Sequence, residues 1–259
     1  DYANALAYFQ EAMALYNELD DPNGIARILH NMALVARGQG NFAQALTWLQ
    51  ASHELEQQSH PQQSVDPLSL ANIGVTLYEM DDLPAAQRSL REAHQQAQQQ
   101  QDAWTTAFIA GNLAEVLRVA GELEESAHFA QASLAGFLAL GDHHYTPEPQ
   151  LNLAQIALSR GDLASARTLA DAVLAHYESM KDGHGIANVL PLQAQIVLCE
   201  TEDRTGAIRA AKLLEQAITL RSQIARPLSI HEERERTALR TQIEQRLIEE
   251  EKSTKARMA

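Results

Sequence analysis

The chain repeats itself with a period of about 40 residues, and this period constrains its fold more than any other feature. One series of small residues follows the period, at Ala5, Ala45, Ala86, Ser126, Ala166 and Ala210. A second series keeps the same spacing, at Ala33, Gly74, Ala114, Ala154 and Ala194. Turn-forming pairs recur with them, at Gly40-Asn41, Asp81-Asp82, Gly121-Glu122 and Gly161-Asp162. A chain with three such series folds as a stack of similar units.

Each unit is predicted to be a pair of antiparallel helices joined by a short turn. Glycine and proline contribute only 12 and 8 of the 259 residues, and 45% of the chain is hydrophobic. Few helix breakers favour helices over strands, and this hydrophobic content is enough for a buried core. One hairpin cannot bury its apolar face alone, so the hairpins must stack. We therefore expect an all-α solenoid of about five and a half hairpins.

The spaced residues resemble the tetratricopeptide repeat (TPR): a small residue, a turn glycine, an aromatic residue or leucine, then alanine and a bulky apolar residue. The resemblance covers residues 1 to about 220, and its period exceeds the usual ~34 residues. This long form is similar to the repeats of kinesin light chain, of peptide-sensing bacterial regulators and of bacterial STAND-type signal-transduction ATPases. The resemblance implies a right-handed superhelix and a non-catalytic module that binds a protein or peptide.

The repeat pattern also sets the expected domain boundaries. Residues 1–228 should form the solenoid, which starts in the middle of a repeat, as in a piece of a longer protein. Residues 229–250 should form a C-terminal capping helix, because Ser229 and Glu232 have capping-box spacing and an apolar stripe follows at Leu239, Ile243 and Leu247. Residues 251–259 should be a disordered tail.

The segment 210–234 has a further resemblance, to the end of the repeat region in STAND-type bacterial regulators such as the maltose-regulon activator class. That resemblance implies a sensor domain that regulates an adjacent ATPase or effector domain. The phosphate-binding motif Gly-x-x-x-x-Gly-Lys-Ser/Thr does not occur in the sequence. Any such ATPase therefore lies outside this chain.

Charge and cysteine content limit the partners and the compartment. The formal net charge of -14 argues against direct binding of nucleic acid or of an anionic membrane surface. No run of apolar residues is long enough to span a bilayer. Cys199 is the only cysteine, so an internal disulfide is excluded and a reducing environment fits. We expect a cytoplasmic protein.

An asparagine series is the most specific candidate for a binding site. Asn31, Asn72, Asn112 and Asn152 each stand two residues before the small residue of the first helix. Asparagine is disfavoured inside helices, by roughly 0.5 kcal/mol relative to alanine, so four of them at one position need a reason. Each amide could hold the backbone of an extended peptide, because it offers a donor and an acceptor. Alternatively, each could bond the helix of an adjacent repeat and hold the curvature.

Residues three or four positions from these asparagines lie on the same helical stripe. The predicted groove therefore adds to the asparagines the residues Arg27, His30, Arg37, Tyr78, Phe108, Glu115, Arg118 and Gln155. In the next repeat Leu192 stands where asparagine is expected, directly after Pro191. The series should end there.

Catalytic and metal sites are not indicated. The ten histidines show no metal-ligand spacing, and His143-His144 should lie in a loop between repeats. Cys199 follows the apolar run 196–198 and should be buried and inert. We expect no enzyme activity, no metal and no cofactor.

The leading hypothesis is a sensor or adaptor that binds an extended peptide or partner protein in its concave groove. A structural scaffold is the alternative, with self-association through the convex face or the terminal helix and a possible homo-oligomer. Sensing of a small molecule is a third class, and it requires an enclosed pocket. Other domains of the same full-length protein are expected partners in the leading hypothesis.

Overall fold

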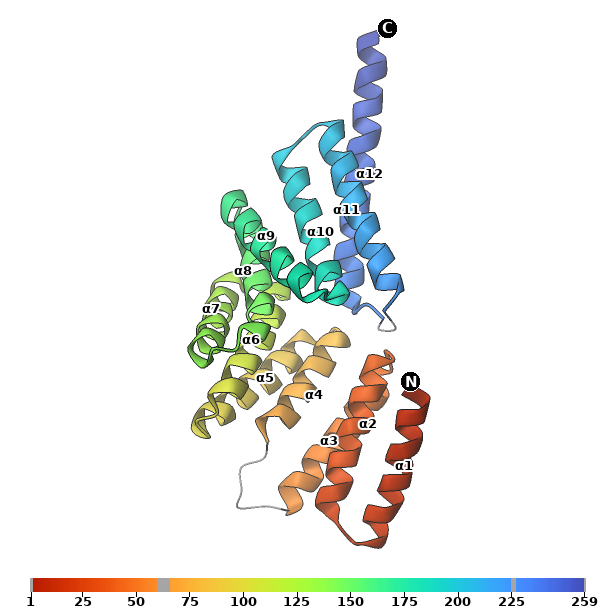
Figure 1. The fold of residues 1–259 in the computed structure, drawn as a ribbon, viewed down its shortest axis with the longest axis vertical. Helices are drawn as coiled ribbons and strands as arrows, with labels where there is room; N and C mark the ends of the chain where they lie inside the picture. Colours follow the sequence, from red (N-terminus) through yellow and green to blue (C-terminus); the bar gives the residue numbers. More distant parts are fainter. Residues whose placement is uncertain (1, 60–65, 225–226, 259) are drawn as a thin grey trace. The chain divides into compact units, whose positions relative to one another are not determined.

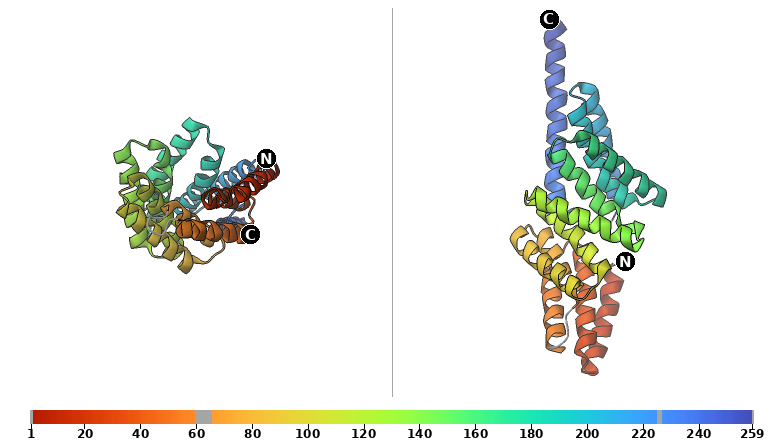
Figure 2. Two further views of the ribbon diagram at one scale, coloured as in Figure 1. Left: turned by 90° about the horizontal axis from the view of Figure 1, so that it is seen from below. Right: turned by 90° about the vertical axis from the view of Figure 1, so that its left-hand side faces the viewer.

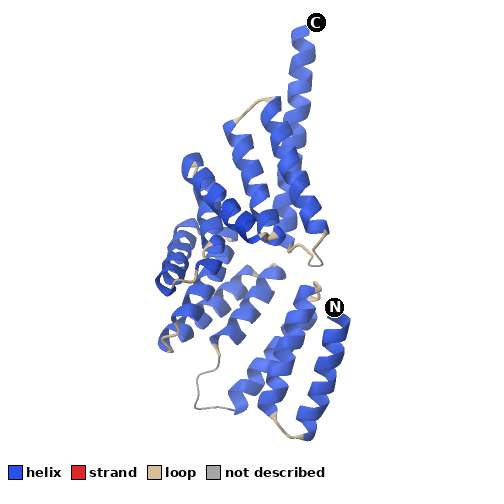
Figure 3. Ribbon diagram, viewed as in Figure 1, coloured by secondary structure: helices blue, strands red, loops and turns tan. Residues whose placement is uncertain are grey.

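The regular structure of the chain is helical. The computed structural model describes residues 2–59, 66–224 and 227–258, without the side chains of residues 2, 3 and 250–258. This part of the chain contains twelve α-helices and one short 3-10 helix, and it contains no strand (Figure 3). The predicted all-α class is confirmed. None of the helices in the described part combines the length and the apolar character that crossing a bilayer requires.

The chain divides into two compact units. Unit 1 comprises Asp1–Gly141 with Ala225–Ile230, and unit 2 comprises Asp142–Ile224 with His231–Ala259. The helices of unit 1 are α1 (Tyr2–Glu18), α2 (Pro22–Gly38), α3 (Phe42–Ser59), α4 (Pro67–Glu79), α5 (Leu83–Gln99), α6 (Ala103–Val119) and α7 (Leu123–Leu140). Those of unit 2 are the 3-10 helix η1 (His143–Tyr145), α8 (Pro147–Ser159), α9 (Leu163–Met180), α10 (Gly183–Glu200), α11 (Arg204–Ser222) and α12 (Ile230–Met258).

Consecutive helices form the predicted antiparallel hairpins (Figures 1 and 2). Unit 1 contains the hairpins α2–α3, α4–α5 and α6–α7, and unit 2 contains α8–α9 and α10–α11. Helix α1 packs on α2 and carries Ala5, a member of the small-residue series that the second helices share. We call α2, α4, α6, α8 and α10 the first helices and their hairpin partners the second helices.

The small residues of the repeat lie where two helices of a hairpin meet. In the first series of small residues, every member after Ala5 is fully buried, namely Ala45, Ala86, Ser126, Ala166 and Ala210. Ser126 also donates its hydroxyl to the carbonyl oxygen of Ala114, at 2.6 Å, which ties α7 to α6. A Cβ placed on Gly74 would lie only 2.7 Å from Cγ of Leu90. Close helix approach therefore explains why the period selects small side chains.

The turn pairs also adopt the conformation that their residue types favour. Gly40, Gly121 and Gly161 have φ angles of 79°, 83° and 79°, and Asp81 has a φ of 70°. Glycine adopts this left-handed region without strain, and aspartate tolerates it better than most residues do. After two of these turns the next residue caps the second helix: Asp82 accepts a hydrogen bond from the backbone N–H of Ala85, and Asp162 accepts one from that of Ser165, both at 3.1 Å.

Helix α12 packs on the last hairpin of unit 2 and runs further than the sequence indicated. Leu239 and Ile243 are buried in a cluster with residues of α10 and α11, and Leu247 packs against the same cluster. The helix continues to Met258, eight residues beyond the expected end at 250. Residues 251–258 contain no glycine or proline and consist mainly of strong helix formers, so no stop signal occurs there. Ala259 lies outside the described residues.

Candidate functional site

Asn72 connects the first helices of two successive hairpins in unit 1. Its Oδ1 accepts a hydrogen bond from Nη1 of Arg37 at 3.1 Å, and its Nδ2 lies 3.3 Å from Nε2 of His30. Both partners belong to α2, whereas Asn72 belongs to α4. Burial lowers the pKa of His30, and the charge of Arg37 lowers it further against the opposing effect of Asp66. A neutral imidazole can accept a hydrogen bond, so the amide of Asn72 is engaged at both ends.

A second polar bridge connects α4 to α6. The hydroxyl of buried Tyr78 donates to Oε1 of Glu115 at 3.1 Å. The first helices of the three hairpins in unit 1 are thus joined in sequence, α2 to α4 through Asn72 and α4 to α6 through Tyr78. Such contacts hold the helices of adjacent repeats together, which is the structural alternative considered for the asparagines.

Asn112 differs from Asn72, because its donor has no partner. The side chain is half-buried on α6, and its Nδ2 is buried without any hydrogen-bond partner among the described residues. Leaving a buried amide donor unsatisfied costs about 1–3 kcal/mol. Phe108, Glu115 and Arg118 share this face of α6, and Phe108 stacks on Trp104 with ring centroids 5.2 Å apart.

The remaining residues of the predicted groove fall into two places. In unit 1, Asn31 and Arg27 are exposed on α2, and Arg27 donates from Nη2 to the hydroxyl of Tyr16 at 3.3 Å. In unit 2, Asn152 is 8% exposed and Gln155 is half-buried, and both belong to α8. Ten of the predicted residues therefore lie on α2, α4 and α6 of unit 1, while the other two lie on α8 of unit 2.

A polar network in unit 2 escaped the sequence analysis. Arg221 donates from Nη2 to Oδ1 of Asn188 at 2.6 Å and to the carboxylate of Glu232, and its Nη1 lies 3.3 Å from Nε2 of His184. The network joins α10, α11 and α12. The asparagine series was expected to end at Leu192, but Asn188 stands one helical turn earlier on the same stripe. Asn188 is therefore displaced by four residues from the position at which the series predicts an asparagine.

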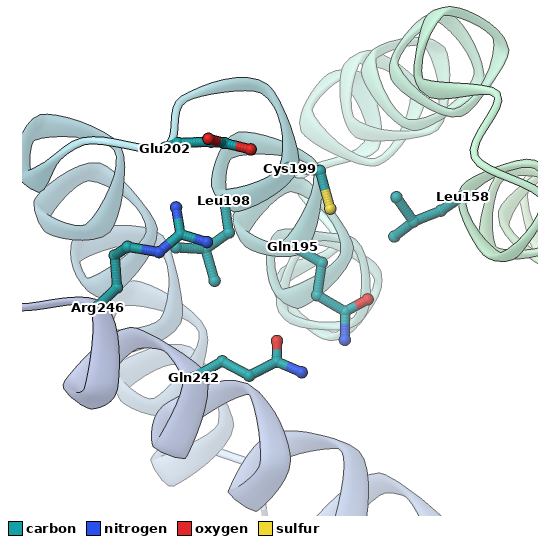
Figure 4. Close-up of a pocket in the computed structure, with 7 residues that line it drawn as sticks. All are labelled: Leu158, Gln195, Leu198, Cys199, Glu202, Gln242 and Arg246. Carbon is teal, nitrogen blue, oxygen red and sulfur yellow. The ribbon is translucent and has the colours of Figure 1, made fainter. Parts of the chain in front are cut away.

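Unit 2 also contains a cavity of about 480 Å³ (Figure 4). It is lined from three helices and the turn after α10, by Leu158, Gln195, Leu198, Cys199, Glu202, Gln242 and Arg246. The expectation that Cys199 is buried is wrong, because its side chain is exposed. The preceding residues 196–198 face the core, while the next position on the helix points away from it.

Metal binding has no structural support in the described part of the chain. No three histidine, cysteine, aspartate or glutamate side chains come together there in a way that could hold an ion. His143 and His144 lie in the 3-10 helix η1, where both are exposed.

The fold is shared with several solved structures at low sequence identity. RapI in its apo form aligns with a TM-score of 0.67 at 11% identity, over 95% of this chain and 93% of that one. A Rap protein complexed with Competence and Sporulation Factor gives 0.64 at 13%, over 95% and 72%. BtubC (BKLC) from P. vanneervenii gives 0.63 at 15%, over 86% and 90%.

The sequence itself matches one family model. The model for the tetratricopeptide repeat matches residues 1–58, 24–99 and 105–179. No curated protein matches the chain. Since the matched segments together span more than half of the sequence, and the hairpins and their small residues follow the repeat, the chain belongs to the tetratricopeptide repeat family.

Proposed function

We propose that the chain binds an extended peptide, or an extended segment of a partner protein, on the first helices of unit 1. Members of the tetratricopeptide repeat family are generally non-catalytic protein-interaction modules. The observation that carries the proposal is the buried Nδ2 of Asn112, which lacks a hydrogen-bond partner within the described residues. When the half-buried side chain turns toward a ligand, a carbonyl oxygen of the ligand backbone would satisfy this donor whatever the sequence of the ligand.

The surroundings of Asn112 suit the rest of such a ligand. The stacked rings of Phe108 and Trp104 offer an apolar surface for a ligand side chain. Glu115 and Arg118 add one negative and one positive side chain to the same face of α6. On this face of α6, Asn112 would contact the backbone of the ligand, and its neighbours would contact the side chains of the ligand. Backbone contacts supply affinity and side-chain contacts supply specificity in the recognition of extended peptides.

A related fold with a bound ligand gives the proposal further support. The Rap protein that aligns with 95% of this chain was solved as a complex with Competence and Sporulation Factor. That complex supports the general role of holding a ligand on a solenoid of this fold. The contact residues proposed above belong to this chain's own α6.

The proposal assigns different roles to Asn112 and Asn72. Asn112 would contact the ligand, whereas Asn72 would mainly hold α4 to α2 through His30 and Arg37. The test starts from peptides selected from a random display library against the wild-type chain. Their affinity and the free energy of unfolding are then measured for Asn112→Ala, Asn72→Ala and Asn31→Ala.

We expect Asn112→Ala to weaken peptide binding roughly tenfold or more without lowering stability, because one hydrogen bond to the ligand is lost and one orphaned donor is removed. Asn72→Ala should lower the free energy of unfolding by about 1–3 kcal/mol, because its hydrogen bonds with His30 and Arg37 are lost. Unchanged affinity of every selected peptide for Asn112→Ala would reject the proposed site.

We further propose that ligand binding regulates an ATPase or effector domain adjacent to this chain in a cytoplasmic bacterial signalling protein. This part rests on the resemblance of segment 210–234 to the end of STAND-type sensor regions. Nucleotide hydrolysis by the longer protein, with and without a selected peptide, tests it. A rate that does not respond to a peptide that binds would contradict the regulatory role.

A further inference from the structure

The cavity of unit 2 is lined by two opposite charges that do not pair with each other. Arg246 of α12 and Glu202, in the turn after α10, both line it, and no ion pair joins them in the described structure (Figure 4). Nη1 of Arg246 is buried and has no hydrogen-bond partner among the described residues. Glu202 is exposed at the cavity. Burying a guanidinium donor without an acceptor is unfavourable, and a ligand in the cavity that Arg246 lines could bring an acceptor to this side chain.

The other lining residues define what else the missing group contains. Gln195 of α10 and Gln242 of α12 contribute carboxamides, which both donate and accept hydrogen bonds. Leu158 of α8 and Leu198 of α10 contribute apolar surface. The volume of about 480 Å³ falls within the range of cavities that hold small molecules, roughly 300–1,000 Å³.

These features together select a zwitterion over a simple ion. A simple anion would be attracted by Arg246 but repelled by Glu202. A simple cation would be attracted by Glu202 but repelled by Arg246. A molecule whose ammonium and carboxylate groups are attached to the same carbon can meet the arginine and the glutamate at once. We propose that this cavity binds a free α-amino acid with an apolar side chain.

In this site the carboxylate of the amino acid accepts hydrogen bonds from Arg246, and its ammonium group donates to Glu202. The carboxamides of Gln195 and Gln242 complete the polar contacts, and the side chain lies against Leu158 and Leu198. The ligand would connect α12 to α10, because Arg246 and Glu202 come from different parts of unit 2. The site uses none of the residues of the peptide proposal, so either can fail without the other.

Cys199 provides a reporter at the site. It is the only cysteine of the chain, it is exposed, and it lines the cavity. A bound amino acid would therefore shield its thiol from a chromogenic disulfide reagent. The rate of thiol modification is measured in the presence of each common amino acid, and binding is measured independently by calorimetry.

Two analogues and two pairs of variants make the test specific. Leucinamide lacks the carboxylate, and N-acetyl-leucine lacks the ammonium group. Arg246→Gln and Glu202→Gln remove one charge each from the cavity. Arg240→Gln and Glu244→Gln are matched controls, because both residues are exposed on α12 and neither lines the cavity.

We expect leucine or another apolar amino acid to slow modification of Cys199 severalfold in the wild type and in both controls. Each analogue, and each cavity variant with leucine, should bind at least roughly tenfold more weakly, because one charge-assisted contact is lost. Circular dichroism shows whether Arg246→Gln still folds, and the exposed Glu202→Gln provides the same test if it does not. The proposal is overturned if no amino acid binds, or if the analogues bind as well as leucine.

Discussion

Burial lowers the pKa of three histidines in unit 1, namely His30, His53 and His94. Desolvation is the largest cause of the lowered pKa in each case. The charges of Arg37 and His128 lower the pKa of His30 and His94 further, whereas Asp66 raises that of His30 and Glu92 and Glu54 raise that of His53. All three imidazoles thus bind a proton more weakly in the folded chain than in the unfolded one.

This shift makes the stability of unit 1 depend on pH. When folding lowers the pKa of a histidine, the free energy of unfolding is highest above 6.5, the pKa of the histidine in the unfolded chain. It decreases as the pH falls from 6.5 through the lower pKa of the folded chain, because the unfolded chain then binds more protons. We therefore expect the free energy of unfolding in urea to be smaller at about pH 5.5 than at about pH 8.

Substituting the histidines tests this origin. His30→Gln, His53→Gln and His94→Gln combined should flatten the dependence on pH between those two values. His144→Gln is the control, because His144 is exposed in unit 2. A triple variant that keeps the wild-type slope would assign the dependence to other groups.

The asparagine series shows what can be predicted at a single residue. The sequence places four asparagines at one position of the repeat, but the structure gives them different environments. Asn31 is exposed, Asn72 bonds a neighbouring helix, the amide donor of Asn112 has no partner among the described residues, and Asn152 is buried. The partners of Asn72 lie 35 and 42 residues away along the chain. Spacing along one helix does not reveal which side chain of the next hairpin will face it, so the environment of each asparagine could not be predicted.

At the scale of helices, the close approach of α4 and α5 gives a direct test of why the repeat uses small residues. A Cβ on Gly74 would lie 2.7 Å from Cγ of Leu90 and 3.2 Å from the carbonyl oxygen of Ala86. The backbone oxygen cannot move away without displacing α5. Gly74→Ala should therefore lower the free energy of unfolding by about 1–3 kcal/mol, as measured by urea denaturation.

Gly183→Ala is the matched control for Gly74→Ala. Gly183 is the first residue of α10, and a Cβ there would meet nothing within 4 Å. Alanine at this place should leave stability unchanged or raise it by up to about 1 kcal/mol, because alanine favours helix. Equal losses in the two variants would indicate a general effect of removing glycine rather than packing at Gly74.

Helices and turns are the level at which the sequence was most informative. Period and turn residues predicted the hairpins, because helix pairing between neighbours in the chain depends on local spacing and on small residues at the contact. The short helix η1 and the end of α12 were not predicted. Neither has a distinctive local signal: Gly141 ends α7 like any other turn glycine, and residues 251–258 simply continue a helix-forming composition.

At the scale of the whole molecule, the division into two units has no counterpart in the sequence. The repeat spacing of 40 residues between Ser126 and Ala166 passes unchanged through the boundary at Gly141. Helix α12 belongs to unit 2, where Leu239 and Ile243 complete a core with α10 and α11. Removing α12 would uncover that core, so a truncation before residue 230 is a poor test of self-association through the terminal helix.

A single core substitution in α12 tests whether the two units are separately stable. Leu239 is 1% exposed, and Leu239→Ala should destabilise unit 2 by about 2–5 kcal/mol because it leaves a cavity. Ile248→Ala on the same helix is the control, because Ile248 is 52% exposed and contributes little buried surface. Hydrogen exchange of the backbone amides, followed by mass spectrometry, reports the two units separately in one sample.

Amides of α8–α11 should exchange faster in Leu239→Ala than in the wild type, whereas those of α2–α7 should keep their protection. This follows if each unit opens as one cooperative block whose stability depends on its own buried cluster. Leu239 contacts the cluster of α10 and α11, and among the described side chains the core cluster of unit 1 includes none from α12. A uniform loss of protection from α2 to α11 would mean that the solenoid unfolds as one cooperative block, despite the compactness of each unit. Loss confined to α12 itself would mean that this helix covers unit 2 without stabilising it.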